Sequence, residues 1–339
     1  MSGRFFTVFL ATMLTALPIA GRAAPSWGVG LHRLTLEDPV DHQPMSAVAF
    51  YPSWVKRGDT HIDLFRIAGR EDTPPAPGRF PLIVLSHGNG GSPLAHHDLA
   101  TALAHRGFIV LAVQHPGDNV DDQSRIGRFS NLYGRPMQLS AAIDAVGQDK
   151  LLGDEVDSRQ VGVIGYSAGG ESALILAGGH PELQHLRQYC EKQPDDAEAC
   201  ERAASLAIDD DVVEAAPDSR VRSLLLLAPL GLMFGRQDLA DVQVPVLLYA
   251  GAEDHLLLPA ENAAALARRL PGPADYRVVP GAGHFVFMAP CSAEMREAAP
   301  QLCDDGEGVD RMAVHDSLNS EAVRFFSQTL TAPQTAAQL

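Results

Sequence analysis

Short apolar runs recur along the chain and alternate with segments in which helix-forming residues repeat every few positions. An apolar run between turn residues is typical of a strand buried on both faces of a sheet. Such strands are expected at residues 80–86, 108–113, 161–164, 221–227, 244–249 and 276–279, and helices at 93–106, 138–146, 168–177, 260–270 and 310–330. Because strands that alternate with helices pair in parallel, the pattern predicts a doubly wound, mostly parallel α/β sheet.

Apolar and polar residues alternate loosely in three earlier segments, residues 29–37, 45–54 and 61–67. This alternation is typical of strands that bury one face and expose the other. We therefore expect these segments to be antiparallel first strands that begin a mixed sheet.

Residues 180–220 lie between the helix predicted at 168–177 and the next strand, and they form an insertion. The insertion contains Cys190, Cys200 and several acidic residues. One interpretation is a helical lid or cap over the carboxyl ends of the strands, and the other is a solvated decoration of the surface. In either case the insertion belongs to one predicted catalytic domain, residues 24–339.

The residues Gly165-Tyr166-Ser167-Ala168-Gly169 lie where a predicted strand meets a predicted helix. A serine at such a junction occupies a sharp turn that lifts its hydroxyl group above the sheet, and this nucleophile elbow needs small flanking residues. The five-residue pattern also arises by chance, so the strand before it and the helix after it carry the prediction. We expect Ser167 to be a nucleophile.

Two further candidate catalytic residues follow later predicted strands. Asp254 comes after the strand at 244–249, and His284 comes after the last strand. The carboxyl ends of the strands share one crevice in a doubly wound sheet, so both residues are expected to converge on Ser167. His284 would accept the proton of the serine hydroxyl group, and Asp254 would hold the imidazole in the required tautomer. Glu253 remains an alternative acid.

A glycine-rich segment, HGNGG at residues 87–91, directly follows the strand at 80–86. Glycines let the backbone approach a ligand and point N–H groups at it, although a flexible turn is the plainer interpretation. A tetrahedral intermediate needs such donors for its negatively charged oxygen. We expect the backbone N–H groups of Asn89 and Ala168 to form an oxyanion hole.

Other residues near these motifs have plainer interpretations. We expect His87 to fix the glycine-rich loop through hydrogen bonds, and His96 and His97 to lie on a solvated helix surface. Several apolar residues flank the predicted crevice and are either core or an acyl-binding wall. They are Leu230, Leu232, Met233, Phe234, Phe285, Phe287 and Met288.

The N-terminus is typical of a signal peptide that is removed on export. Arg4 precedes an apolar run at residues 5–20, and small residues precede a cleavage site predicted after Ala23. A membrane-spanning helix is less favoured, because the run is short and contains Pro18. We therefore expect a signal peptide at residues 1–23, no stable membrane span, and a secreted or periplasmic protein.

The four cysteines form two local pairs, Cys190 with Cys200 and Cys291 with Cys303. An even number, local spacing and an export signal favour two disulfide bonds. A zinc site would need shorter spacing and histidines in the same loops. Cys190 and Cys200 cannot pair across a straight helix, so we expect a bend between them.

Acidic residues outnumber basic ones, 42 to 26, and the formal net charge is −16. A surface this negative repels the phosphate backbone of nucleic acids. The charge therefore argues against nucleic acid as a partner and leaves a small molecule as the expected substrate.

Four motifs, HGNGG, GYSAGG, AGAEDHLLLP and GAGH, together resemble the α/β-hydrolase superfamily. The chain is most similar to the branch of dienelactone-hydrolase-like proteins and platelet-activating-factor acetylhydrolases, from roughly residue 34 to residue 326. The resemblance implies an α/β-hydrolase fold and a serine esterase that acts on a small-molecule ester and uses no metal or organic cofactor.

The chain departs from both groups in the branch. Dienelactone hydrolases carry a cysteine nucleophile, whereas this chain has Ser167. The acetylhydrolases take their acid from the strand after the elbow, but here that strand ends in residues 228–232 without a carboxylate, so Asp254 must serve. We therefore expect an exported carboxylic-ester hydrolase. An amide or peptide hydrolase, an acyltransferase and an inactive binding module are the alternatives.

Overall fold

The computed structural model describes residues 26–330 except residues 57, 208 and 210–214. Among these residues, nine strands form one sheet. They are β1 (Gly28–Glu37), β2 (Pro44–Ser53), β5 (Arg70–Glu71), β6 (Phe80–Ser86), β7 (Ile109–Val113), β8 (Val156–Tyr166), β9 (Val221–Leu227), β10 (Val246–Gly251) and β11 (Asp275–Val279).

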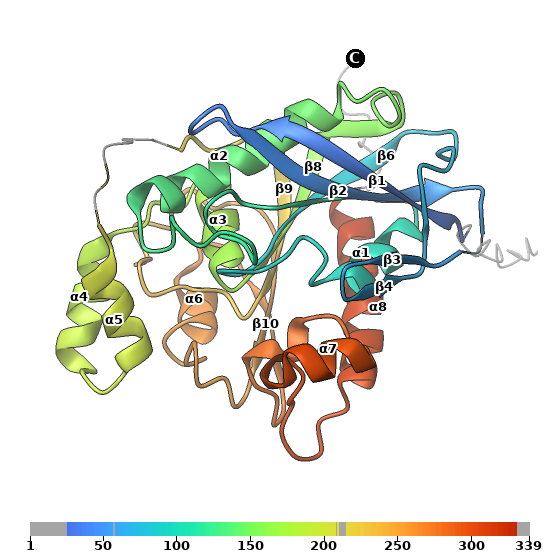
Figure 1. The fold of residues 1–339 in the computed structure, drawn as a ribbon. Helices are drawn as coiled ribbons and strands as arrows, with labels where there is room; N and C mark the ends of the chain where they lie inside the picture. The colour runs from blue at the N-terminus through green and yellow to red at the C-terminus, as the bar shows by residue number, and fades with distance from the viewer. Residues whose placement is uncertain (1–25, 57, 208, 210–214, 331–339) are drawn as a thin grey trace, which may run out of the picture.

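The strand order is β11-β10-β9-β8-β6-β7-β2-β1-β5 (Figure 1). Strand β2 is antiparallel to both β1 and β7, and every other neighbouring pair is parallel. The prediction of a doubly wound, mostly parallel sheet with antiparallel first strands is confirmed.

The third loosely alternating segment does not join this sheet. Residues 61–67 instead contribute to a separate hairpin of β3 (Thr60–Ile62) and β4 (Phe65–Ile67). Asp63 has a positive φ of 51°, so the chain reverses before a longer strand can form. The expectation of a third strand in the main sheet is therefore wrong.

Eight α-helices and two 3₁₀ helices accompany the strands in the described ranges. They are α1 (His97–Ala104), α2 (Phe129–Val146), α3 (Ala168–Leu176), α4 (Leu183–Lys192), α5 (Ala197–Ser205), α6 (Ala263–Arg269), η1 (His284–Phe287), α7 (Ala293–Ala298), η2 (Pro300–Leu302) and α8 (Arg311–Leu330). Helix α2 begins well before the predicted residue 138 and contains Pro136. Helix α6 begins only after Pro259, which lies in a preceding turn.

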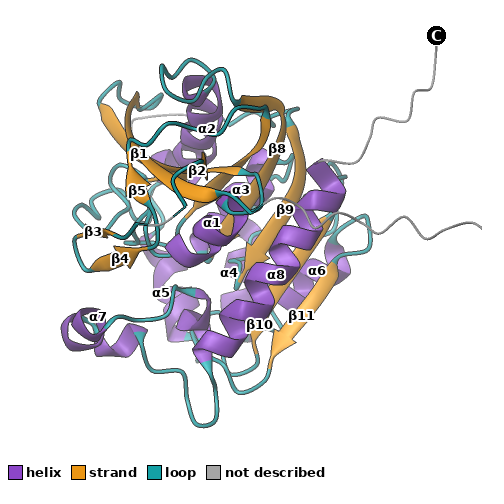
Figure 2. Ribbon diagram, turned by 90° about the vertical axis from the view of Figure 1, so that its right-hand side faces the viewer, coloured by secondary structure: helices purple, strands orange, loops and turns teal. Residues whose placement is uncertain are grey.

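Helices cover both faces of the sheet and create two cores. Helices α2, α3 and α6 lie on one face, and α1 and α8 lie on the other (Figure 2). Their side chains form the two cores with the side chains of the strands. Strand β6 shows why its sequence is continuously apolar: Leu82 and Val84 point into the first core, while Ile83 and Leu85 point into the second. Burial on both faces therefore sets the apolar pattern of the central strands.

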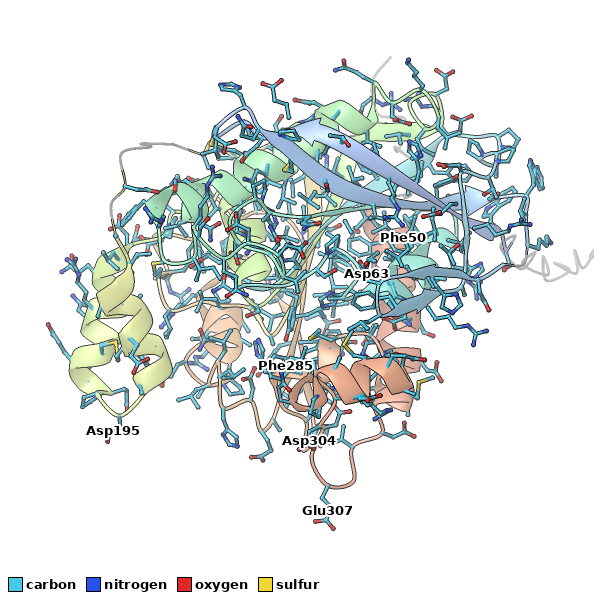
Figure 3. The ribbon with its side chains drawn as sticks, viewed as in Figure 1. Phe50, Asp63, Asp195, Phe285, Asp304 and Glu307 are labelled. Atoms are coloured by element: carbon cyan, nitrogen blue, oxygen red, sulfur yellow. A yellow bond between two sulfur atoms is a disulfide. The ribbon has the colours of Figure 1, made fainter. Side chains whose placement is uncertain are left out.

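The insertion at residues 180–220 contains α4 and α5, which form a helical hairpin joined by the Cys190–Cys200 disulfide bond. The Cα atoms of this pair are 5.5 Å apart, because the chain bends between the helices. Asp195 lies in that bend, at the outer tip of the hairpin (Figure 3). The second predicted disulfide bond, Cys291–Cys303, also forms, and it spans α7 and η2.

The predicted signal peptide at residues 1–23 lies outside the described residues. Among the helices that are described, none combines the length and the apolar character needed to cross a membrane.

Candidate active site

Ser167 occupies the sharp turn between β8 and α3. Its backbone has φ 54° and ψ −118°, a region that residues with a side chain rarely adopt and that costs roughly 1–3 kcal/mol. Backbone hydrogen bonds hold the turn, because Ser167 N donates to Leu227 O at 3.0 Å and Leu230 N donates to Ser167 O at 3.0 Å. The strained serine predicted from the strand-to-helix junction is therefore present.

The two flanking glycines are required by close backbone contacts. A Cβ atom at Gly165 would lie 2.3 Å from Gly169 O. A Cβ atom at Gly169 would lie 2.0 Å from Ser86 O, at the end of β6. Both distances are far below van der Waals contact, so only glycine allows the strand and the helix to meet at this turn.

Asp254 and His284 form a buried hydrogen-bonded pair. Asp254 follows β10 and His284 begins η1, and the carboxylate Oδ2 lies 2.7 Å from His284 Nδ1. The other carboxylate oxygen accepts hydrogen bonds from Leu256 N at 3.0 Å and Leu257 N at 2.8 Å. The side chain of Glu253 is 62% exposed, so Asp254 is the carboxylate that the fold places on the imidazole.

The elbow lies next to this pair. The ring of Tyr166, the residue before Ser167, lies 5.1 Å from the ring of His284, and its hydroxyl group donates to His284 O at 3.3 Å. Both residues are buried. The three segments that carry the predicted serine, aspartate and histidine thus meet at the carboxyl edge of the sheet, as strand-end topology predicts.

The glycine-rich loop approaches the serine from the other side. A Cβ atom at Gly88 would lie only 3.1 Å from Ser167 Cβ. Asn89 and Ala168, whose backbone N–H groups were predicted to bind an oxyanion, line one cavity of about 360 Å³. The sequence therefore brings both predicted donors to the same cavity.

Apolar side chains form most of the remaining wall of this cavity. Leu186 and Ala199 belong to the disulfide-linked hairpin, so the insertion borders the cavity rather than lying apart from it. The other apolar wall residues are Ile126, Leu132, Leu206, Leu230, Leu232, Met233 and Leu257. Of the residues with two interpretations, Leu230, Leu232 and Met233 line the cavity, and Leu232 and Met233 also belong to the first core. Phe234 and Phe287 are core.

A larger cavity of about 590 Å³ lies elsewhere, between the β3–β4 hairpin and the chain that follows η1. Its walls include Phe65, Met288 and Met295. None of the three predicted catalytic residues lines either cavity, but Ala168 places the cavity of about 360 Å³ directly beside Ser167. No group of three or more histidine, cysteine, aspartate or glutamate side chains within the described part of the chain is arranged to hold a metal ion.

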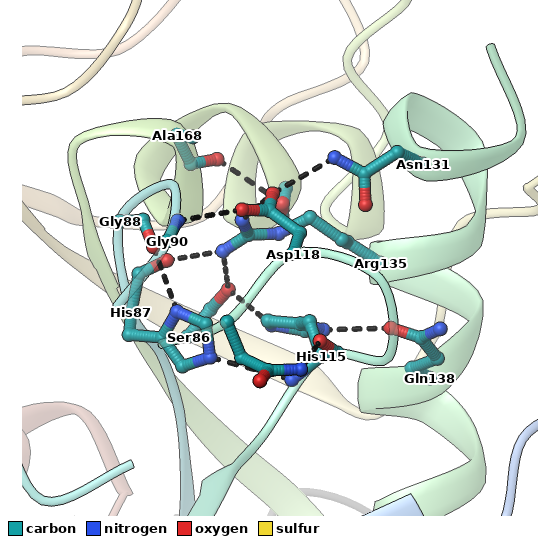
Figure 4. A network of polar contacts seen from close by, with 12 residues as sticks. Ser86, His87, Gly88, Gly90, His115, Asp118, Asn131, Arg135, Gln138 and Ala168 are labelled. Carbon is teal, nitrogen blue, oxygen red and sulfur yellow. Dashed lines mark hydrogen bonds and ion pairs between the residues drawn. The ribbon is translucent and has the colours of Figure 1, made fainter. Parts of the chain in front are cut away.

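A buried polar network supports the glycine-rich loop (Figure 4). Asp118 accepts a hydrogen bond from Gly90 N at 2.7 Å, and it pairs with Arg135 at 2.6 Å and Asn131 at 2.8 Å. Burial alone would raise the pKa of the Asp118 carboxyl group, but the Arg135 charge and these hydrogen bonds lower it. Arg135 also donates to His87 O, so one guanidinium group contacts both the Asp118 carboxylate and the backbone of the glycine-rich loop.

The hydrogen bonds behind the loop run in one direction. Gln138 Nε2 donates to Asp38 at 3.0 Å, which leaves Gln138 Oε1 to accept from His115 Nδ1 at 2.7 Å. His115 Nε2 must then accept from the Ser86 hydroxyl group at 2.8 Å, and Ser86 Oγ accepts from Arg135 at 3.1 Å. Burial holds the pKa of His115 well below its ordinary value, which keeps this ring neutral.

The sequence predicted the role of His87 but missed most of its partners. His87 Nδ1 donates to Gly88 O at 2.7 Å and Nε2 accepts from His115 N at 3.3 Å, while burial lowers the pKa of the ring to about 4. Asp118 was within reach of prediction, because it follows β7 at the same sheet edge. The sequence did not predict a role for Arg135, because the helix that carries it was expected to begin only at residue 138.

His96 is not on a solvated surface, so the expectation is wrong for this residue, whereas His97 is half-buried and lines the larger cavity. The side chain of His96 is buried, and its ring lies 4.8 Å from the ring of Tyr166. Among the described residues neither ring nitrogen of His96 has a hydrogen-bond partner. Burial lowers the pKa of His96 to about 3.

Comparison with known proteins agrees with this architecture. The chain belongs to the alpha/beta hydrolase family, whose model matches residues 83–295. A solved structure with a similar fold is the ferulic acid esterase from Streptomyces cinnamoneus, with a TM-score of 0.62, 20% sequence identity, and coverage of 95% of this chain and 96% of that chain. The comparison with curated proteins found no match.

The substitution Asp118→Asn tests the loop support. It leaves the buried Arg135 charge without its carboxylate partner, so we expect a loss of about 3 kcal/mol in the free energy of unfolding, measured in urea. We also expect a fluorophosphonate to label the protein at least about tenfold more slowly, because the loop donors lose their fixed positions. The exposed Asp121→Asn is the control, and equal behaviour of the two variants would contradict the assignment.

The substitution His96→Phe tests the buried histidine through acid stability. The unfolded chain binds a proton at this residue below about pH 6.5, whereas the folded chain does so only near pH 3, so the wild type loses stability as the pH falls. The phenylalanine variant should keep the ring contact with Tyr166. Its free energy of unfolding should fall by about 3 kcal/mol less than that of the wild type between pH 6.5 and pH 4. Parallel acid unfolding curves for the two proteins would show that His96 is not buried in its neutral form.

Proposed function

We propose that this protein is a carboxylic-ester hydrolase that works through an acyl-enzyme on Ser167. The observation that carries the proposal is the buried Asp254–His284 hydrogen bond of 2.7 Å, which lies beside a serine in a strained strand-to-helix turn. Membership of the alpha/beta hydrolase family supports it. The carboxylate, imidazole and hydroxyl group supply the acid, base and nucleophile of acyl transfer.

The hydrogen bond fixes the chemistry of the imidazole. His284 Nδ1 donates a hydrogen bond to the Asp254 carboxylate. Nε2 therefore carries the lone pair that accepts the Ser167 hydroxyl proton. The serine oxygen attacks the ester carbonyl carbon, and the tetrahedral intermediate expels the alcohol, which takes its proton from His284. Water then attacks the acyl-enzyme by the same route and releases the acid and free Ser167.

The backbone N–H groups of Asn89 and Ala168 are the proposed oxyanion donors. Both residues line the cavity that adjoins the elbow, and Ala168 is the first residue of α3. Donors held in place before the reaction stabilise the developing charge without reorganisation. The network around Asp118 and Arg135 supports this role, because it fixes the loop that carries Asn89.

The cavity wall supports an apolar acyl group as the bound part of the ester. Leucine, isoleucine, alanine and methionine together supply ten of its sixteen lining residues, and such a wall gains free energy by removing hydrocarbon from water. The structural likeness to a ferulic acid esterase favours an ester over an amide or a transfer reaction. We further propose that α4 and α5 act as the lid of this cavity, and that the signal peptide and the two disulfide bonds reflect export.

The substitutions Ser167→Ala and Asp254→Asn test the proposed triad with p-nitrophenyl esters and a fluorophosphonate probe. Ser167→Ala should abolish both turnover and labelling, and Asp254→Asn should lower kcat by roughly 10³–10⁴ because the imidazole loses its oriented tautomer. The exposed Ser124→Ala should behave as wild type.

The outcomes separate the alternatives. Labelling of Ser167 with turnover of amides only would replace the esterase with an amide or peptide hydrolase. Faster acyl transfer to an added alcohol than to water would indicate an acyltransferase. A wild-type protein that is neither labelled nor active would be a binding module.

The paired substitution Cys190→Ala and Cys200→Ala tests the lid. The hairpin borders the cavity, so we expect the preferred acyl length in a series of p-nitrophenyl esters to shift, with a moderate loss in thermal stability. The matched control is Cys291→Ala with Cys303→Ala, which removes a disulfide bond of similar span from a segment that does not border this cavity. The same shift in both variants, or none in the first, would contradict the lid.

A further inference from the structure

His315 of α8 lies behind the segment that carries the proposed general base. The ring is buried, with Nδ1 2.6 Å from Asp98 Oδ2 and Nε2 2.8 Å from Val286 O. Val286 belongs to the 3₁₀ helix η1, which begins with His284. One imidazole thus connects the first turn of α1 to the backbone two residues from the base.

Both oxygens that His315 contacts are acceptors. The backbone carbonyl of Val286 has no proton to give, and Asp98 is ionised, because its hydrogen bonds with His315 and Asn319 outweigh burial and lower its pKa to about 2. Each ring nitrogen of His315 must therefore donate, which requires the doubly protonated imidazolium. Burial by itself would lower the pKa of His315, but the hydrogen bond and charge of Asp98 raise it above its ordinary value.

Among the described residues, the charged groups that act on His315 are Asp98 and Arg311. Across from His315, His97 of α1 and His96, which precedes that helix, have lowered pKa values and are neutral near pH 7. On α8 itself, Arg311 opposes the imidazolium charge, but it is paired with Asp305 at 2.6 Å. The carboxylate of Asp98 is therefore the charge that decides the protonation of His315.

We propose that His315 is a positioning residue: its bridge from Asp98 to Val286 O holds η1, and thereby His284, in the geometry that proton transfer requires. The proposal rests on the proposed role of His284 as the general base. A neutral ring can donate from only one nitrogen, and it keeps the shorter, charge-assisted bond to Asp98. Loss of the proton therefore releases Val286 O and frees η1.

The bridge predicts a bell-shaped pH profile for kcat. The acidic limb is the one that every general-base mechanism has, because the base must be unprotonated to accept a proton. Activity also falls toward high pH, because His315 has its raised pKa in the folded protein and the bridge is lost as the pH rises through that value. A triad without such a bridge needs only the acidic limb.

Two nearly isosteric substitutions divide the bridge into its halves. The side-chain amide nitrogen of His315→Asn takes the place of Nδ1 and can reach Asp98 but not Val286 O. The amide nitrogen of His315→Gln takes the place of Nε2 and can reach Val286 O without a titrating group. The matched control is the same pair of substitutions at His105, whose ring donates to Trp27 O at 2.6 Å at the other end of α1.

We expect His315→Asn to lower kcat by about tenfold at pH 7 with little change in KM, because η1 is released. His315→Gln should keep kcat within about threefold of wild type and lose the alkaline limb of the pH profile. Both His105 variants should keep the wild-type profile. Equal kcat values for His315→Asn and His315→Gln, or an alkaline limb that persists in His315→Gln, would overturn the proposal.

Nitrogen NMR of the histidine rings provides a test that does not depend on activity. The pH at which His315 loses its second ring proton should lie above the ordinary value of about 6.5 for an imidazole, and a midpoint at or below that value would overturn the bridge. Fluorophosphonate labelling of Ser167 in the wild type tests the proposed function separately. A wild type that is unlabelled and inactive but has a doubly protonated His315 would refute the esterase and the positioning role. The bridge itself would stand.

Discussion

The structure depends on one backbone constraint, the turn that forces Ser167 into a positive φ between β8 and α3. The cost of this conformation must be met by its surroundings. Gly165 and Gly169 have no side chains, so α3 can pack against the end of β6. The backbone of Ser167 also forms hydrogen bonds with Leu227 and Leu230. Because these contacts come from three central strands, the position of the serine is a property of the whole sheet.

The loops at this edge are held from behind by buried polar groups. The Asp118–Arg135 pair and the chain of hydrogen bonds through His115 fix the glycine-rich loop, while Asp98 and His315 fix η1. Buried charges of this kind are expensive unless every partner is present, so they specify one arrangement rather than add general stability. The surface cavity can then be lined by leucines and by a separate helical hairpin without disturbing the turn at Ser167 or the Asp254–His284 pair.

Most of the fold was predictable, because burial on both faces gives the central strands uninterrupted apolar sequences, and β6 and β9 have the predicted bounds. The meeting of the segments that carry Ser167, Asp254 and His284 at one sheet edge was also predictable, since strand-end topology depends on strand order alone, and the catalytic roles of the three residues stay a prediction. The beginning of α2 was missed, because Pro136 is a poor helix-interior residue, and Arg135 was lost with it. The burial of His96 depends on a contact with Tyr166, which local sequence does not reveal.

The most direct test of the account is a crystal structure of the protein after reaction with a fluorophosphonate. The account predicts one covalent bond, to Ser167 Oγ, with the phosphoryl oxygen about 2.7–3.1 Å from the backbone nitrogens of Asn89 and Ala168. His284 should remain hydrogen-bonded to Asp254, with Nε2 facing the adduct. An adduct on another residue, or a phosphoryl oxygen that points away from both backbone nitrogens, would contradict it.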